Sequence, residues 1–246
     1  MRARAGFGRT RDPGAPIPSP NIWHWPALYE IENRAQDVDG AVFAALADLA
    51  DWSGVVVDVG CGSGFHLPRF AATASRVVGV EPHPPLAAAA RERIAGLAGV
   101  EVHRAGAEAL PLPDASVDVV HARTAYFFGP GCGPGIAEAM RVLRPGGILV
   151  VVDLDATAHP YGAWMRADLA QYDPAAVETF FDVQGFGCRR VDTRWEFESR
   201  EDLAAVLGIE FTPRTAARAV AGTVGTALDV RYRVHWRRRP RGIEPV

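Results

Sequence analysis

Short apolar runs alternate with helical patterns between residues 54 and 155, and this alternation restricts the fold more than any other feature. Most of the runs are nearly continuous in Val, Leu and Ile. Strands of that kind, joined by helices, are typical of a parallel sheet covered on both faces. We therefore predict an α/β domain with strands at residues 54–60, 76–82, 100–106, 116–123 and 147–155. Helices are predicted at residues 65–74, 86–97 and 133–143, the last one ending at the Arg-Pro-Gly-Gly run.

The flanking segments differ in character from this central region. Residues 1–20 are rich in Arg, Gly and Pro, which predicts a flexible arm, and residues 21–50 predict a cap or lid of helices. Residues 51–246 are expected to form one domain. Its last segment, residues 226–240, alternates apolar and polar side chains, which predicts an antiparallel strand at a sheet edge.

The basic residues are unusual, because all 26 of them are arginine. A chain without lysine cannot supply a P-loop lysine, a Schiff-base lysine or a lysine general base. The net charge of −3 does not favour nucleic acid or a membrane surface as partner. Nor does any apolar run reach the roughly 18–20 residues that cross a bilayer.

The cysteines and the N-terminal segment indicate a compartment. Cys61, Cys132 and Cys188 are odd in number and lack paired metal-ligand spacing, which predicts free thiols in a reducing cytosol and no metal site. The first 20 residues contain arginines but no apolar core of a secretory signal. We therefore expect a cytoplasmic protein, either a monomer or a homodimer.

A glycine-rich turn follows the first predicted strand, in the stretch VVVDVGCGSGF. Glycine allows a tight turn and a close approach of the backbone to a ligand. Dinucleotide folds need the spacing G-x-G-x-x-G, but Phe65 and Leu67 occupy the third glycine position in the two possible registers. Asp58 beside the turn would repel a pyrophosphate and would suit a cationic ligand instead.

Two further acidic positions follow this turn. Glu81 ends the second predicted strand, 23 residues after Asp58, where a carboxylate can accept hydrogen bonds from ribose hydroxyls. Glu108 follows the third strand, and with Ala107 it could flank the edge of an adenine. These positions point to a nucleoside with a positively charged extension.

The stretches VVVDVGCGSGF, VVGVEP, AEALPLPDASVDVV and RVLRPGGILVVVD occur in this order. They resemble the successive motifs of class I S-adenosylmethionine-dependent methyltransferases, in particular the small-molecule branch called methyltransferase type 11. The likeness covers about residues 50–155. It implies a Rossmann-like three-layer sandwich around a mostly parallel seven-stranded sheet of order 3-2-1-4-5-7-6, with strand 7 antiparallel.

The resemblance also implies a cofactor, S-adenosylmethionine, with S-adenosylhomocysteine as product. Gly106 stands where the family often has an acidic residue, so adenine recognition would pass to Glu108 or a backbone carbonyl. Tyr29, Arg34 and His121 are further expected cofactor contacts, Arg34 reaching the cofactor carboxylate. The other implied contacts are Asp58, Gly60, Cys61, Gly62 and Gly64 for the amino-acid part, Glu81 and Pro82 for the ribose, and Ala107 and Glu108 for the adenine.

Methyl transfer from a sulfonium needs mainly alignment and exclusion of water, and a general base only when the acceptor arrives protonated. His24 and His159 are the candidates for such a base. Substrate contacts are expected from Trp23, Trp25, Arg123 and Tyr126. The aromatic cluster at residues 23–29 fits either a lid over an apolar or aromatic acceptor or a packing element for the first helix.

Three other functions stay open at this point. A nucleic-acid methyltransferase would use the six arginines between residues 231 and 241, but HARTAYFF follows the fourth strand in place of the Asn/Asp-Pro-Pro-Tyr/Phe run of amino-methylating DNA enzymes. The fold could also hold S-adenosylmethionine for a cyclisation or decarboxylation, or as a structural ligand. Turnover to S-adenosylhomocysteine with candidate acceptors would distinguish these functions.

Overall fold

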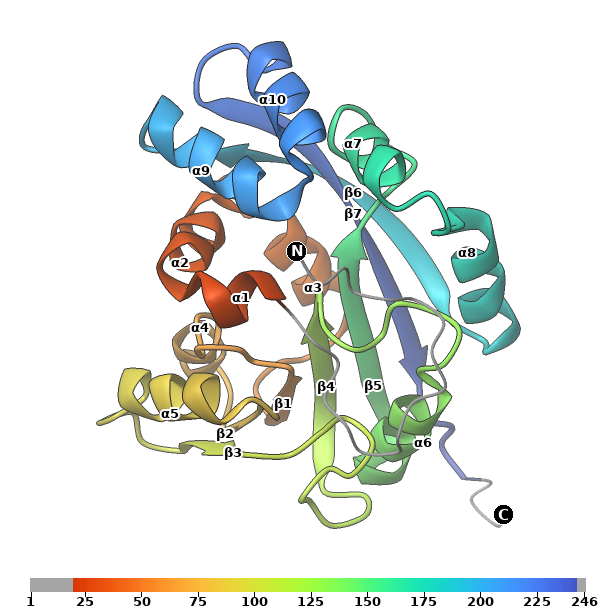
Figure 1. The fold of residues 1–246 in the computed structure, drawn as a ribbon. Coiled ribbons are helices and arrows are strands. Elements are labelled where there is room, and N and C mark those ends of the chain that lie inside the picture. The colour runs from red at the N-terminus through yellow and green to blue at the C-terminus, as the bar shows by residue number, and fades with distance from the viewer. Residues whose placement is uncertain (1–19, 243–246) are drawn as a thin grey trace.

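A seven-stranded sheet crosses the computed structural model, which describes residues 20–242 (Figure 1). The strand order is β3-β2-β1-β4-β5-β7-β6, and β7 runs antiparallel to both of its neighbours. The predicted fold class and strand order are therefore confirmed. The strands are β1 (Val55–Val59), β2 (Arg76–Val80), β3 (Val100–His103), β4 (Val117–Arg123), β5 (Leu143–Leu154), β6 (Gly187–Glu196) and β7 (Ala227–Arg238).

Helices cover both faces of this sheet (Figure 1). One face carries apolar side chains of α3, α5, α9 and α10, and the other carries those of α6 and α8. Alternate residues of β1 enter the two cores: Val56 joins the first, whereas Val57 and Val59 join the second. The helices are α1 (Pro20–His24), α2 (Pro26–Ala35), α3 (Ala41–Leu49), α4 (Leu67–Ala71), α5 (Pro84–Arg93), α6 (Gly133–Val142), α7 (Tyr161–Asp168), α8 (Pro174–Val183), α9 (Arg200–Glu210) and α10 (Pro213–Gly222).

The structure corrects the predicted position of the last strand. β7 lies between β5 and β6, so the edge of the sheet on this side is β6. Arg233 is fully buried, and its guanidinium contacts Tyr172. The arginines of β7 therefore lie on an interior strand of the sheet. Arg231 pairs with Asp192, and Arg239 donates to the carbonyl of Arg141.

Two local features concern the positions where strands and helices begin. The Arg-Pro-Gly-Gly run does follow a helix, but it belongs to β5, which starts at Leu143 with a register shift beside Val117 and Val119. After β5, the chain forms two further helices, α7 and α8. Asp173 begins α8, because its carboxylate accepts hydrogen bonds from the backbone of Ala175 and Ala176.

The N-terminal cap consists of α1, α2 and α3, and α9 packs against α2 (Figure 1). Glu32 of α2 is buried beside Glu210 of α9, and Glu210 also binds Asn21 of α1 and Tyr161 of α7. The predicted arm at residues 1–20 lies, apart from the backbone of Pro20, outside the described residues. Between residues 20 and 242, no helix has the length and apolar character that crossing a membrane requires.

Candidate functional site

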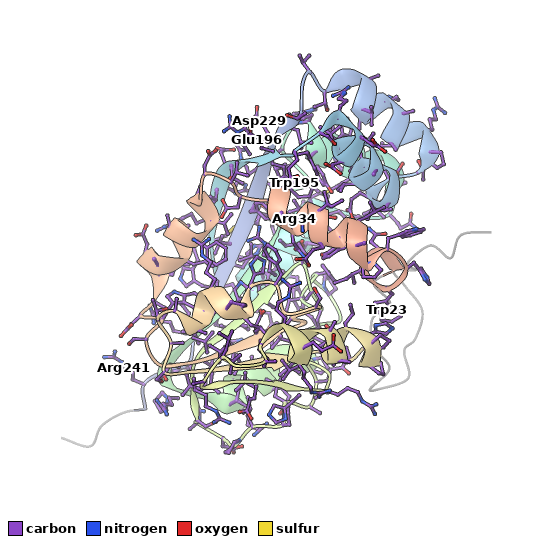
Figure 2. The ribbon with its side chains drawn as sticks, turned by 90° about the vertical axis from the view of Figure 1, so that its left-hand side faces the viewer. Trp23, Arg34, Trp195, Glu196, Asp229 and Arg241 are labelled. Carbon is purple, nitrogen blue, oxygen red and sulfur yellow. The ribbon has the colours of Figure 1, made fainter. Side chains whose placement is uncertain are left out.

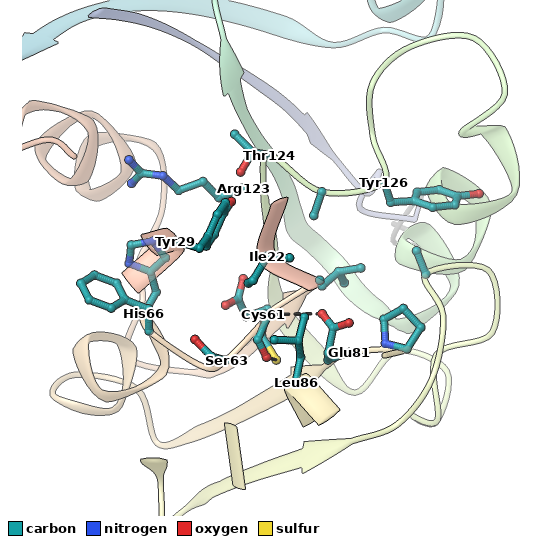
Figure 3. Close-up of a pocket in the computed structure, with 18 of the residues that line it drawn as sticks. Ile22, Tyr29, Cys61, Ser63, His66, Glu81, Leu86, Arg123, Thr124 and Tyr126 are labelled. Atoms are coloured by element: carbon teal, nitrogen blue, oxygen red, sulfur yellow. Dashed lines mark hydrogen bonds between the residues drawn. The ribbon is translucent and has the colours of Figure 1, made fainter. Parts of the chain in front are cut away.

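A pocket lies at the carboxyl ends of β1, β2, β3 and β4, beneath α1 and α2 (Figure 3). In an open α/β sheet this is where ligands bind, because the strand order reverses between β1 and β4. Of the residues predicted to form the site, those that line this pocket are Trp23, Tyr29, Asp58, Gly60, Cys61, Gly62, Glu81, Pro82, Ala107, Glu108, Arg123 and Tyr126.

The turn after β1 needs glycine for two reasons. Gly60 and Gly62 have φ angles of +73° and +56°, a region that residues with a Cβ rarely adopt. A Cβ at Gly60 would also overlap the Cβ of Ala125, and one at Gly62 would lie 2.9 Å from Ile22 Cδ1. The turn thus packs directly against α1 and the segment after β4. This close packing leaves the backbone of the turn facing the pocket.

Glu81 connects the turn to β2. Its carboxylate oxygens accept hydrogen bonds from the backbone N–H groups of Gly62, at 3.0 Å, and His83, at 2.9 Å. Burial raises the pKa of Glu81, and the two backbone bonds partly oppose this shift. The carboxylate is therefore held in one orientation at the pocket wall, with lone pairs left to accept from vicinal hydroxyls.

Asp58 and His121 form a buried pair at the base of the pocket. His121 Nδ1 lies 2.7 Å from Asp58 Oδ1, and the His121 ring packs against Phe70 at 5.0 Å between centroids. Only Asp58 of this pair lines the pocket. His121 is 1% exposed and lies behind Asp58, so the predicted direct contact of His121 with the cofactor is corrected to a contact with Asp58.

Glu108 and Tyr126 meet at the opposite end of the pocket. The Tyr126 hydroxyl donates to Glu108 Oε1 at 2.9 Å and accepts from the backbone N–H of Gly135 at 3.3 Å. Burial and the neighbouring Glu108 carboxylate raise the pKa of Tyr126. Tyr126, predicted as a substrate contact, therefore orients the residue predicted to bind adenine.

The cap helices bring some of their predicted residues to the pocket and keep others away. Trp23 lines it and stacks on His83, with ring centroids 4.5 Å apart. His24 and Trp25 point outward and contact each other edge to face. Arg34 lies in the last turn of α2, far along the cap from Trp23 (Figure 2), and its half-exposed side chain approaches Glu30.

The structure therefore does not place His24, Trp25 or Arg34 in this pocket. His159 is exposed and lines a separate recess with Asp192, Thr193 and Asp229. Gly64 does not line the pocket either. It packs against α5, where a Cβ at this position would lie 3.1 Å from the Cβ of Ala90. Both histidines proposed as a base are thus outside the site.

Other pocket residues were missed from the sequence. Asn33, Gln36, His66 and Thr124 all line the pocket. Asn33 and Gln36 follow Tyr29 by four and seven residues, which places all three on one helical face, and this spacing could have identified them. Burial, followed by the charge of Arg123, lowers the pKa of His66, so its imidazole is neutral at pH 7.

Comparison with known proteins agrees with this geometry. Residues 57–151 match the family described as Methyltransferase domain. This part of the chain therefore resembles a class I methyltransferase domain. Within it, the turn, Glu81 and Glu108 occupy the positions that the resemblance assigns to the amino-acid, ribose and adenine parts of S-adenosylmethionine. The individual contacts with that cofactor stay predictions.

The curated relatives resemble less than half of the chain. A 37.1 kDa uncharacterized protein in a transposon of Streptomyces fradiae is 36% identical over 102 residues, which cover 40% of this chain and 30% of that protein. An uncharacterized methyltransferase of Mycobacterium ulcerans is 41% identical over 96 residues, covering 39% and 37% of the two chains. The chain thus aligns with only about a third of the length of these relatives.

Solved structures share the fold over more of the chain. A SAM-dependent methyltransferase from Aquifex aeolicus has a TM-score of 0.52 and 21% identity, covering 68% of this chain and 92% of its own. The [4+2]-cyclase SpnF has a TM-score of 0.57 and 22% identity, covering 85% of each chain. A geranyl diphosphate methyltransferase solved with SAM has a TM-score of 0.57 and 14% identity, covering 89% and 91%.

Proposed function

We propose that this protein transfers a methyl group from S-adenosylmethionine to an oxygen, nitrogen or carbon atom of a small molecule. The observation that carries the proposal is the continuity of one pocket. It extends from Glu108 and Glu81, past the glycine turn, to a polar end formed by Gln36, His66 and Arg123 (Figure 3). The first part fits the cofactor, and the second offers polar groups to an acceptor.

The position of the cap favours a small molecule as the methyl acceptor. Ile22 and Trp23 of α1 and Tyr29 of α2 line the pocket, so helices cover the side from which an acceptor would approach. A buried site of this kind excludes water and restricts the acceptor to molecules that fit beneath the cap. Whether α1 and α2 move as a lid stays a prediction.

The residues of the pocket would act mainly by alignment. S-adenosylmethionine, when bound, supplies a methyl group already activated on sulfur. Holding an acceptor against it in a fixed orientation can contribute about 7–11 kcal/mol to lowering the barrier. At the polar end, the neutral imidazole of His66 can accept a proton from a hydroxyl or amine acceptor. We propose His66 as this base in place of His24 and His159.

The setting and partners of the protein belong to the same proposal. Three cysteines without disulfide bonds support a reducing compartment such as the cytoplasm. The arginine-only composition is typical of a high-GC genome, where such enzymes often modify secondary metabolites. Nucleic acid is not favoured as acceptor, because Arg231, Arg233 and Arg239 are engaged within the chain. We expect a monomer or a homodimer.

Calorimetry with S-adenosylhomocysteine and a turnover assay test the proposal separately. We expect micromolar or tighter binding, and methyl transfer to at least one member of a panel of phenols, amines and carboxylic acids. The resemblance of the fold to a [4+2]-cyclase makes cofactor binding without methyl transfer a second candidate. Tight binding with no product across the panel would favour that candidate, and absence of binding would refute both.

A further inference from the structure

The charged groups of the pocket are unevenly distributed. Its three carboxylates belong to Asp58, Glu81 and Glu108, at the end predicted to hold the cofactor. Arg123 is the only arginine among the lining residues, and it lies beside Tyr29 and His66 at the polar end (Figure 3). His66 is neutral. The pocket thus contains one fixed positive charge, at the end away from Glu81 and Glu108.

Arg123 is held in place without an acidic partner. Its Nη2 donates to Gln36 Oε1 at 3.0 Å, and Gln36 Nε2 in turn donates to Glu32 Oε1 at 2.8 Å. The side chain of Gln36 therefore separates the guanidinium of Arg123 from the carboxylate of Glu32. The guanidinium also lies over the Tyr232 ring, 4.9 Å from its centroid, and hydrogen bonds to the Tyr232 hydroxyl.

This arrangement leaves hydrogen-bonding capacity unused. Arg123 is 8% exposed, and its Nε is buried with no hydrogen-bond partner. Among residues 20–242, none of the ion pairs within 4.0 Å includes Arg123. The other deeply buried arginine, Arg233, has Asp153 at 3.8 Å and Glu178 at 3.9 Å. Burying a cation without a carboxylate is costly, and a bound anion would remove that cost.

We propose that Arg123, positioned by Gln36 and Glu32, forms a carboxylate-binding subsite at the polar end of the pocket. A planar guanidinium matches a carboxylate better than it matches a neutral group. The carboxylate can come from the amino-acid part of the cofactor or from the acceptor. The second source would narrow the acceptor class to carboxylic acids, and only this part rests on the proposed function.

Two pairs of probes distinguish the sources. S-adenosylhomocysteine is compared with its decarboxylated analogue, 5′-deoxy-5′-(3-aminopropylthio)adenosine, which keeps the ammonium group. With S-adenosylhomocysteine present at saturation, 4-hydroxybenzoate is then compared with neutral 4-hydroxybenzamide. Dissociation constants are measured by calorimetry for the wild-type chain, Arg123→Gln and Arg123→Lys. Arg218→Gln, an exposed position of α10, is the matched loss of one positive charge.

We expect the wild-type chain to prefer the carboxylate member of one pair by about 10- to 100-fold, the range for a charge-assisted hydrogen bond. Arg123→Gln should reduce this preference to about twofold or less, Arg123→Lys should keep part of it, and Arg218→Gln should keep all of it. The pair that shows the effect identifies the source. Thermal melting confirms that each variant is folded.

The comparison of ligands in the wild-type chain tests the subsite by itself, without any substitution. If that chain binds S-adenosylhomocysteine but shows no carboxylate preference in either pair, the subsite is refuted while the proposed function is untouched. A preference that survives in Arg123→Gln but disappears in Arg34→Gln would also refute it. A chain that binds neither S-adenosylhomocysteine nor 4-hydroxybenzoate would refute the subsite and the proposed function together.

Discussion

The close packing of the glycine turn can be measured with two substitutions that share a backbone conformation. Gly60 and Gly40 have φ angles of +73° and +70°, so an alanine at either position carries a similar left-handed strain. A Cβ at Gly40 would meet nothing within 4 Å, whereas a Cβ at Gly60 would overlap Ala125 Cβ. The difference between Gly60→Ala and Gly40→Ala therefore isolates the contact between the turn and the segment after β4.

The strain of a left-handed residue costs roughly 1–2 kcal/mol, and restriction of the unfolded chain returns about 0.4–1 kcal/mol. Gly40→Ala should then lower the free energy of unfolding by about 1 kcal/mol. Gly60→Ala adds an overpacking cost of about 1–3 kcal/mol, because the overlap lies well inside the optimal carbon separation of about 3.5–4.0 Å. For a chain of this size, each kcal/mol lowers the melting temperature by about 2–4 °C.

Urea unfolding followed by circular dichroism measures these free energies. The double variant Gly60→Ala/Ala125→Gly provides the decisive comparison, since it removes the atom that the new Cβ would overlap. Referred to Ala125→Gly alone, the cost of Gly60→Ala should fall to that of Gly40→Ala. Equal costs for the two alanine variants, or no relief from Ala125→Gly, would refute the packing described here.

Three further outcomes follow from the site and the cap. Glu81→Gln should weaken binding of S-adenosylhomocysteine by about 10- to 100-fold in calorimetry, because a charged acceptor for ribose hydroxyls is lost; unchanged affinity would contradict the ribose assignment. Burial raises the pKa of Glu32 and Glu210, so the native state keeps protons that the unfolded chain releases above the ordinary value of 4.5. The stability contributed by this pair is therefore greatest below pH 4.5 and falls as pH rises toward the raised native values. Glu210→Gln should flatten the fall in melting temperature between pH 5 and 8, whereas the exposed Glu198→Gln should not, and parallel curves would rule out the shared burial. Tyr126→Phe removes the hydrogen bond to Glu108 and should weaken binding of S-adenosylhomocysteine and of its decarboxylated analogue equally, by about 2- to 10-fold. An effect on stability alone would limit Tyr126 to a packing role.

The framework of the cofactor site follows from the order of residues along the chain. Apolar runs joined by helices specify parallel strands, and the carboxyl ends of parallel strands meet at one edge of the sheet. Gly60 and Glu81 come directly after β1 and β2, and Glu108 follows the end of β3 by five residues, so all three converge at the same edge of the sheet. Local spacing was sufficient for these positions because the backbone hydrogen bonds of the sheet set their distances.

The spacing of residues along α2 is informative about which of them face the pocket. Tyr29 and Arg34 are five residues apart, which places them about 140° apart around a helix, so both cannot face the same pocket. Asn33 and Gln36 lie within about 40° of Tyr29 and do face it. The expectation for Arg34 rested on its charge alone, and the helical period already opposed it.

The histidines and the buried arginines show where sequence spacing is insufficient. Nothing local distinguishes His66, which lines the pocket, from His24, which faces outward, since their orientation depends on how α1 and α4 pack. The same applies to Arg123 and Arg233. Both lie on strands, yet Arg123 contacts the amide of Gln36, whereas Arg233 lies near the carboxylates of Asp153 and Glu178. Their partners come from α2, α8 and β5, distant in the chain, and are brought together only when the helices bury their apolar faces against the sheet.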